Sequence, residues 1–266
     1  EAEDEDTLVV DLRPIEDETS LFRTDSIQPD GDAGDKKGPK KKKRTKMTVQ
    51  KKKPKFRLPR YKNESLRPVL MRKFAKALLV KGIAFDDDLY YTSDCPCLMN
   101  NIELEPSIQK MSPENLQVFL RFKEMSRKGF YAPISIEYHP TQEFVAVAAE
   151  DIPDLTLISE YSGIVEPTRS HLFDTKNDSI MDLLRTTTSS SSLVICPDRR
   201  GNLGRYLSGV NNSSKEGLRK LNVRSGRFNI NGQCRIVLYA NRNIKKGEIL
   251  YYDYNAGCFG EYPTQG

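Results

Sequence analysis

The chain has 266 residues, of which 37% are hydrophobic and 30% charged, a composition typical of a globular domain joined to a polar, disordered portion. No apolar run reaches the roughly 18 residues needed to span a bilayer, which excludes a helical membrane protein. The only histidines, His139 and His171, argue against a histidine-based catalytic triad or a two-histidine metal site. Among five cysteines, Cys95-Pro-Cys97 has no second pair to complete a zinc site. We therefore expect no metal, and free thiols in a reducing compartment.

The net charge of +5 is unevenly distributed along the chain. Residues 1–35 hold 13 acidic side chains against two arginines, whereas residues 36–60 hold 14 lysines and arginines and no acid. Both blocks have little apolar periodicity, so we predict that residues 1–60 form a disordered tail. The basic block suits DNA binding or a nuclear localisation signal. Its charge alone is equally compatible with a solubilising linker, and we favour the nuclear tail.

Two amphipathic helices are predicted after the tail. The first ends near Gly82, and its apolar residues recur at intervals of three and four: Leu66, Val69, Leu70, Phe74, Ala77 and Leu78. The second begins at Ser112-Pro113-Glu114, an N-cap followed by a proline and an acid in the first turn, and Gly129 ends it. Its predicted apolar stripe consists of Leu116, Phe119, Leu120 and Met125. The segment between the helices, residues 84–110, is predicted to be irregular.

Short strands are predicted for most of the remaining chain. Residues 133–138, 143–149 and 155–161 are short apolar or alternating runs separated by turn residues. Asn231-Gly232 supplies the two positive-φ positions of a type I′ turn, which predicts a hairpin of residues 227–230 with 233–240. A last strand is expected near residue 250. These patterns predict a mainly β domain over residues 131–255, preceded by a helical region over residues 61–130.

Three tyrosines crowd the segment GEILYYDYN, Gly247 to Asn255. In a strand, alternation places Tyr252 and Tyr254 on one face and Tyr251 and Asp253 on the other. Two neighbouring phenols form a wall that is aromatic and carries hydroxyl groups, and ring faces attract ammonium and sulfonium groups. The pattern fits a channel for a cationic or methyl-bearing group, although tyrosines are also common in purely structural strands.

Three motifs follow one another in a characteristic order. SEYSG (159–163), GRYLSGVNN (204–212) and GEILYYDYN together resemble the pattern of SET-domain protein lysine methyltransferases. Over residues 60–266 the chain is similar to the plant Trithorax-related monomethyltransferases of histone H3 lysine-27, through SLVICPDRRGNLGRYLSGVNN, NINGQCRIVLYANRNIKKGEILYYDYN and EYPTQ. The resemblance implies a SET-domain fold of short β-sheets over residues 131–255. It also implies a helical pre-SET region at 61–130 and a short post-SET segment at 256–266.

The resemblance also implies an activity and its residues. The reaction would be methyl transfer from S-adenosylmethionine to a lysine of the histone H3 tail, in the nucleus, by a monomer. Tyr254 would align the amine, Tyr161 would line the opposite wall, and Tyr252 would limit the product to one methyl group. The implied cofactor-binding residues are Arg205, Tyr206, Ser208, Gly209, Val210, Asn211, Asn212 and Tyr262. The histone tail would add to a sheet edge as an extended strand, with Met181, Leu183, Tyr161 and Tyr252 as its contacts.

The chain departs from the general SET pattern at three places. Glu143-Phe144-Val145 replaces a Gly-x-Gly, Ser208-Gly209 replaces an Asn-His pair, and no three-cysteine motif follows Tyr254. The last two departures are shared by the plant lysine-27 group. Glu143 keeps a second interpretation open, a catalytically silent SET-like module that binds chromatin or DNA. Methylation of a non-histone lysine is a third interpretation.

Overall fold

The structure, a computed structural model, describes residues 55–168, 179–187, 191–210 and 215–253, which belong to the compact unit Pro54–Gly266. No helix in these ranges is long and apolar enough to cross a membrane. The helices are α1 (Leu66–Val80), α2 (Pro113–Arg127) and α3 (Lys215–Lys220), with 3-10 turns η1 (Cys97–Met99), η2 (Ile102–Leu104) and η4 (Leu203–Tyr206). The strands are β1 (Ala84–Phe85), β2 (Leu89–Tyr91), β3 (Gln109–Lys110), β4 (Ile134–His139), β5 (Glu143–Ala148), β6 (Leu157–Glu160), β7 (Gly163–Pro167), β8 (Met181–Leu184), β9 (Leu193–Cys196), β10 (Arg200–Gly201), β11 (Ser208–Val210), β12 (Val223–Ile230), β13 (Gln233–Ala240) and β14 (Tyr251–Asp253).

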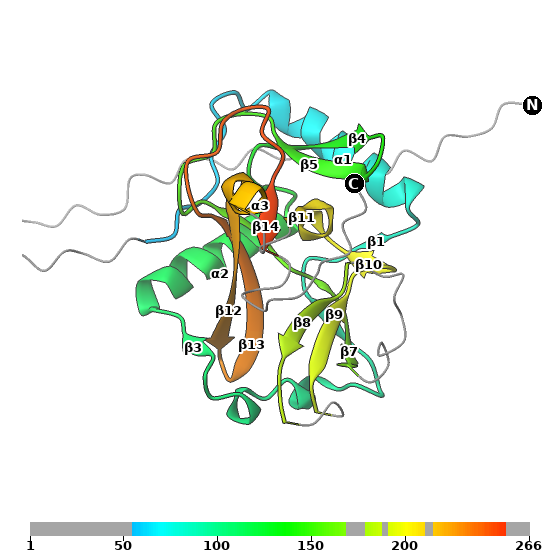
Figure 1. The fold of residues 1–266 in the computed structure, drawn as a ribbon, viewed down its shortest axis with the longest axis vertical. Helices are drawn as coiled ribbons and strands as arrows, with labels where there is room; N and C mark the ends of the chain where they lie inside the picture. The colour runs from blue at the N-terminus through cyan, green and yellow to red at the C-terminus, as the bar shows by residue number, and fades with distance from the viewer. Residues whose placement is uncertain (1–54, 169–178, 188–190, 211–214, 254–266) are drawn as a thin grey trace, which may run out of the picture. The chain divides into compact units, whose positions relative to one another are not determined.

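Within the described residues, the strands form two four-stranded sheets and three two-stranded pairs. One sheet has the order β3-β12-β13-β6 and the other β2-β7-β9-β8, while the pairs are β4–β5, β1–β10 and β11–β14. Figure 1 shows β12 and β13 in the middle of the domain, with β7, β8 and β9 beside them and β11 next to β14. The predicted fold class, mainly β with helices, is confirmed.

The first helix begins and ends where the periodicity predicts. α1 buries Leu70, Phe74, Ala77 and Leu78, and Gly82, with φ of 65°, follows its end in the left-handed region that glycine tolerates. Val69 was predicted to face the core, but it is 40% exposed. α1 lies beside β4 (Figure 1). Its buried face is formed by Leu70, Phe74, Ala77 and Leu78, and the helical spacing places Val69 on the flank of that face.

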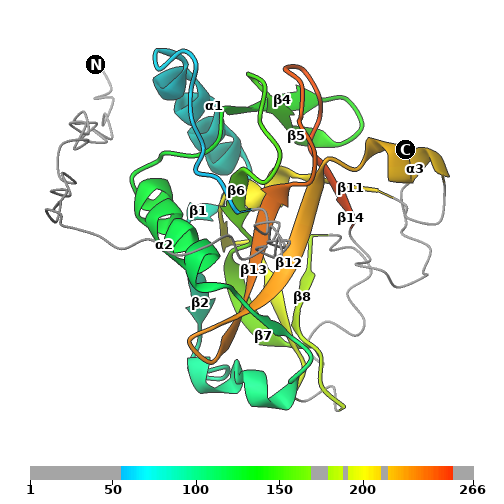
Figure 2. The ribbon, with the colours of Figure 1, turned by 90° about the vertical axis from the view of Figure 1, so that its left-hand side faces the viewer.

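The second helix has the predicted start but a different buried face. The Ser112 side chain accepts a hydrogen bond from the Asn115 N–H, as an N-cap does. Leu120, predicted to be buried, is 48% exposed, and the helix instead buries Phe119, Phe122, Lys123 and Ser126. These four positions follow the spacing of a helical face, but two of them are polar, so an apolar pattern cannot reveal them. In Figure 2, α1 and α2 lie along one side of the strands.

The predicted hairpin is the longest strand pair of the domain. β12 and β13 pair over eight residues each, from Val223↔Ala240 to Ile230↔Gln233, and Asn231 and Gly232 have φ of 54° and 84° as the turn requires. Phe56 is buried although it lies in the segment assigned to the tail, and its ring packs against Phe228 and Tyr239. The folded domain therefore uses residues from at least Phe56 onward.

Candidate active site

Tyr252 lies in the short strand β14, and it is buried while its neighbours Tyr251 and Asp253 are only partly so. This matches the predicted alternation. β14 runs parallel to β11, and the register places Tyr252 opposite Gly209. The buried side chain of Asn222 fixes β14 from the other side. Its Oδ1 accepts from the Tyr251 N–H at 2.7 Å, and its Nδ2 donates to the carbonyl of Ile249 at 2.8 Å.

Tyr161 directly follows β6 and is also buried. Its backbone N–H donates to the carbonyl of Ile236 at 2.9 Å, which extends the pairing of β6 with β13 by one residue. Its hydroxyl donates to the carbonyl of Ser179, two residues before β8. Tyr161 thus connects the central sheet to the segment that leads into Met181.

The turn η4 and the strand β11 lie between these two tyrosines in the fold. Gly204 in η4 packs on Tyr161 so closely that an added Cβ would lie 3.3 Å from Cδ2 of the ring. Arg205 donates through Nε to the carbonyl of Pro197 at 3.2 Å. Ser208, the first residue of β11, donates through Oγ to Oε1 of Gln142 at 2.8 Å. The described part of the GRYLSGVNN motif is therefore an ordered turn followed by a short strand.

Tyr206 is the most unusual residue of this turn. Its ring packs edge-on against Phe74 and Phe144, with centroids 6.1 and 6.4 Å away. Its hydroxyl is buried, yet it has no hydrogen-bond partner in the part of the chain that the structure describes. Burial raises the pKa of Tyr206 to about 12, so the phenol is neutral at physiological pH. A buried polar atom of this kind is available for a hydrogen bond with a bound molecule or a water.

The predicted substrate strand forms a sheet edge. β8 is the outer strand of the sheet β2-β7-β9-β8, and Met181 and Leu183 both point into the core, whereas Asp182 between them is exposed. Because their side chains are buried, a peptide would meet this strand mainly through its backbone.

Known proteins share both the sequence and the architecture of this domain. Residues 143–255 match the family model of the SET domain. The crystal structure of ATXR5 in complex with histone H3.1 monomethylated on arginine-26 superimposes with a TM-score of 0.73 at 38% identity, covering 79% of this chain and 97% of that chain. The chain belongs to the SET-domain family. The predicted SET-domain fold is thereby confirmed.

Two curated relatives are also similar to this chain in sequence. Histone-lysine N-methyltransferase ATXR6 of Arabidopsis thaliana is 41% identical over 197 residues, which cover 73% of this chain and 56% of ATXR6. The probable histone-lysine N-methyltransferase ATXR5 of Ricinus communis is 40% identical over 197 residues, covering 73% of this chain and 52% of the relative. The chain therefore spans a little over half the length of these relatives.

Four predicted residues of the SET site lie outside the described residues: Tyr254, Asn211, Asn212 and Tyr262. Among the residues that are described, no group of three or more His, Cys, Asp or Glu side chains could hold a metal ion.

Glu143, which replaces a glycine of the SET pattern, has φ of 61°. This is the left-handed region that glycine occupies without strain, so a glycine would fit the backbone at this position. The Glu143 carboxylate forms an ion pair with Lys81, at the end of α1. Its charge is thus directed toward α1 and neutralised there.

A partly buried charge cluster includes Glu160, the residue before Tyr161, and the sequence patterns did not reveal it. Lys123 of α2 is 4% exposed and contacts Glu160, which is fully buried, at 2.9 Å. Lys123 also contacts Asp87 and Asp88, each at 3.3 Å. Arg235 of β13 binds both carboxylate oxygens of Glu160. Three cations and three carboxylates make up the charge cluster: Lys123, Arg127, Arg235, Asp87, Asp88 and Glu160.

The charge cluster perturbs the ionisation of its members. Burial lowers the pKa of Lys123, but the surrounding carboxylates, Glu160 first, together raise it above its usual value. Burial also raises the pKa of the Asp88 carboxyl, yet hydrogen bonding and charge from Arg127 and Lys123 bring it below its usual value. Both groups are therefore held in their charged forms.

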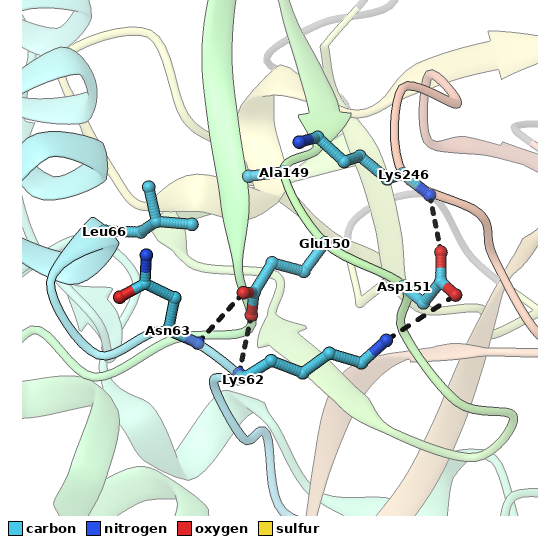
Figure 3. A pocket seen from close by; sticks show the side chains of 7 residues that line it. All are labelled: Lys62, Asn63, Leu66, Ala149, Glu150, Asp151 and Lys246. Carbon is cyan, nitrogen blue, oxygen red and sulfur yellow. Dashed lines mark hydrogen bonds and ion pairs between the residues drawn. The ribbon is translucent and has the colours of Figure 1, made fainter.

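A surface pocket elsewhere on the SET domain is lined by none of the predicted site residues (Figure 3). The carboxylates that line it accept hydrogen bonds from backbone N–H groups of other segments. Glu150 accepts the backbone N–H groups of Lys62 and Asn63 at 2.8 and 3.0 Å, and Asp151 accepts that of Lys246 at 3.0 Å. Glu150 in this pocket therefore fixes the segment before α1, and the pocket is not the candidate active site.

Proposed function

We propose that this protein is an S-adenosylmethionine-dependent histone-lysine N-methyltransferase that adds one methyl group to lysine-27 of histone H3 in chromatin. The observation that carries the proposal is that two buried tyrosines, Tyr161 and Tyr252, both contact the same short segment of the chain. Gly204 of η4 packs on Tyr161, and Gly209 of the following strand is paired with Tyr252. The stretch between those glycines is the segment that resembles the family's cofactor-binding motif.

On the acceptor side, the proposed chemistry needs a neutral lysine amine aligned with the methyl group. An aromatic channel of Tyr161, Tyr252 and Tyr254 would desolvate the amine and lower its pKa, because burial disfavours the charged form. Ring faces would also stabilise the positive charge that the nitrogen gains as the methyl group bonds to it. Fixing the two reacting atoms in line contributes about 7–11 kcal/mol in ideal cases.

On the cofactor side, the residues present fit an adenosyl and methionyl group. The bound cofactor would supply a methyl group on a positively charged sulfur. The unpartnered buried hydroxyl of Tyr206 would offer it a hydrogen bond, and Gly209 would offer backbone groups. The N–H of Ser208 already donates to the Leu250 carbonyl, so Ser208 and Val210 would flank the group. Arg205, Asn211, Asn212 and Tyr262 complete the proposed set.

The single-methyl product rests on Tyr252. Its phenol stands where a phenylalanine would leave room for further methyl groups, so we infer that its hydroxyl fills that room. The histone tail would lie as an added strand along the outer edge of β8. The solved complexes of ATXR5 with histone H3 methylated on arginine-26, the residue before lysine-27, support this choice of substrate. Nuclear localisation, DNA binding through residues 36–60 and a monomeric state belong to the same proposal.

Mass spectrometry tests the proposal directly. The protein is incubated with S-adenosylmethionine and an H3 tail peptide spanning lysine-27, with a peptide carrying arginine at that position as the control. A product heavier by one methyl group at that lysine, and dimethyl product with Tyr252→Phe, is the expected result. Cofactor binding by calorimetry without product on the peptide would refute the substrate and favour a non-histone lysine. Neither binding nor product would favour the silent chromatin module.

A further inference from the structure

Asn202 is a fully buried asparagine immediately before η4. Its Nδ2 donates to Oδ1 of Asp87 at 2.6 Å and to the carbonyl of Glu160 at 2.8 Å. Its Oδ1 accepts from the backbone N–H of Gly204 at 3.0 Å. Both amide hydrogens and the carbonyl oxygen are thus used. The two acceptors and the one donor around it fix which way the amide group faces.

Two of these three partners belong to different parts of the proposed site. The Glu160 carbonyl lies one peptide before Tyr161, the proposed wall of the acceptor channel. The Gly204 N–H lies in η4, which also contains Arg205 and Tyr206, two of the proposed cofactor-binding residues. A side chain at Gly204 would be crowded, since an added Cβ would lie 3.1 Å from Cδ1 of Leu238, 3.2 Å from Oδ1 of Asn202 and 3.3 Å from the Tyr161 ring.

The third partner, Asp87, is itself immobilised. The Tyr131 hydroxyl donates to Oδ1 of Asp87 at 2.7 Å, the Ser126 hydroxyl donates to Oδ2, and Lys123 lies 3.3 Å away. Because Ser126 and Lys123 are on α2, the Asn202 amide is anchored to the helical region outside the sheets. A buried network in which each member is satisfied holds one geometry.

We propose that Asn202 is a positioning residue that locks the acceptor-channel tyrosine and the cofactor-binding turn to each other through α2. The inference rests on the proposed function and deepens it, because methyl transfer requires both substrates to be held in line. Asn202 itself touches neither substrate. A misplacement of about 1 Å at a reacting centre can cost about 100-fold in rate, so a residue that sets this spacing controls turnover.

A matched pair of variants tests the proposal. Asn202→Asp keeps the size and the acceptor for Gly204, but it removes both donors and places a carboxylate beside Asp87. Asn100→Asp is the control, because Asn100 is buried with the same pattern. Its Nδ2 donates to the Tyr91 hydroxyl and the Cys234 carbonyl, and its Oδ1 accepts from the Cys234 N–H. None of these partners belongs to η4 or Tyr161. Asn202→Ser, which adds no charge, replaces Asn202→Asp if that variant does not fold.

The readouts separate a positioning role from a structural one. In the Asn202 variant, amide hydrogen exchange should speed up together in residues 157–165 and 202–208. Cofactor affinity should fall, and kcat on the H3 peptide should fall about 10- to 100-fold, with less change in the peptide KM. The Asn100 variant, compared after melting temperatures are measured, should leave all of these values near wild type.

The inference is overturned if the Asn202 variant loses no more kcat and exchange protection than the Asn100 variant, or if only one of the two segments loses protection. A wild-type protein that methylates no peptide would refute the proposed function instead. The paired exchange result would still decide whether Asn202 couples the two segments, because exchange needs no turnover.

Discussion

Replacing Lys123 by methionine should destabilise the domain strongly. Lys123 is 4% exposed and faces three carboxylates, of which Glu160 is fully buried and Asp87 is 4% exposed. The charge cluster contains three cations and three anions, so the substitution leaves one buried negative charge without compensation. Removing one partner of a buried ion pair costs about 3–5 kcal/mol. For a domain of this size that corresponds to a melting temperature lower by roughly 6–20 °C.

Urea and thermal unfolding followed by circular dichroism measure this loss. Lys128→Met is the matched control, because Lys128 lies one residue beyond the same helix and is exposed, and exposed substitutions usually change stability by less than about 0.5 kcal/mol. Adding Glu160→Gln to the Lys123 variant should recover part of the loss, since it restores the charge balance. Lys123→Met within about 1 kcal/mol of Lys128→Met would refute the reasoning, because a buried cation that matters must cost more than an exposed one.

The pH dependence of the same cluster has a definite sign. The pKa of Lys123 is raised in the folded state, so the native protein holds this proton more tightly than the unfolded chain does. Its contribution is therefore complete below the unfolded pKa of a lysine, about 10.4, and is lost as the pH rises through the folded pKa. The wild type should lose stability in that alkaline range more steeply than Lys123→Met.

Three further predictions concern the site, the tail and the thiols. Tyr254→Phe should abolish methyl transfer while calorimetry finds cofactor affinity nearly unchanged; substantial remaining turnover would contradict its role in aligning the amine. Deleting residues 1–53, which spares the buried Phe56, should leave peptide turnover intact and weaken nucleosome binding in a salt-dependent way; lost peptide turnover would show that the tail does more than tether. Iodoacetamide at pH 8 should label exposed Cys97 before Cys234, because burial raises the pKa of Cys234 to about 12. If mass spectra show both thiols labelled at the same rate, the β12–β13 hairpin that buries Cys234 opens readily.

The elements that the sequence predicted well are those set by neighbouring residues. Asn231-Gly232 specifies its hairpin because the turn needs two positive-φ positions, and both are observed. Ser112 begins α2 because its side chain can accept a hydrogen bond from the first turn. Tyr252 is buried between two half-buried neighbours because a strand alternates its faces. Each rule operates over a few residues, so a single sequence is enough to apply it.

The charge cluster was missed because its members meet only in the folded chain. Lys123 contacts Asp87 across 36 positions of sequence, and Arg235 binds Glu160 across 75. Asp87 lies in a run of three aspartates, a pattern that predicts a solvated loop. Lys123 would be assigned to the polar, exposed face of its helix. An apolar stripe predicts the buried face of a helix only where all the buried side chains are apolar. α2 buries a lysine and a serine as well.

Two buried asparagines show how the SET domain orders a site that its sheets do not cover. Tyr161 follows the end of β6 and Tyr252 lies in a three-residue strand, so neither is held by a long ladder of backbone hydrogen bonds. Asn202 satisfies the carbonyl before Tyr161, and Asn222 satisfies the N–H of Tyr251 beside Tyr252. An asparagine suits both places because its short side chain offers two donors and an acceptor to irregular backbone. Losing Asn222 takes the side-chain acceptor from the Tyr251 N–H. Losing Asn202 leaves the Glu160 carbonyl with the Ser159 hydroxyl as its donor. The proposed walls of the channel therefore depend on residues that do not line it.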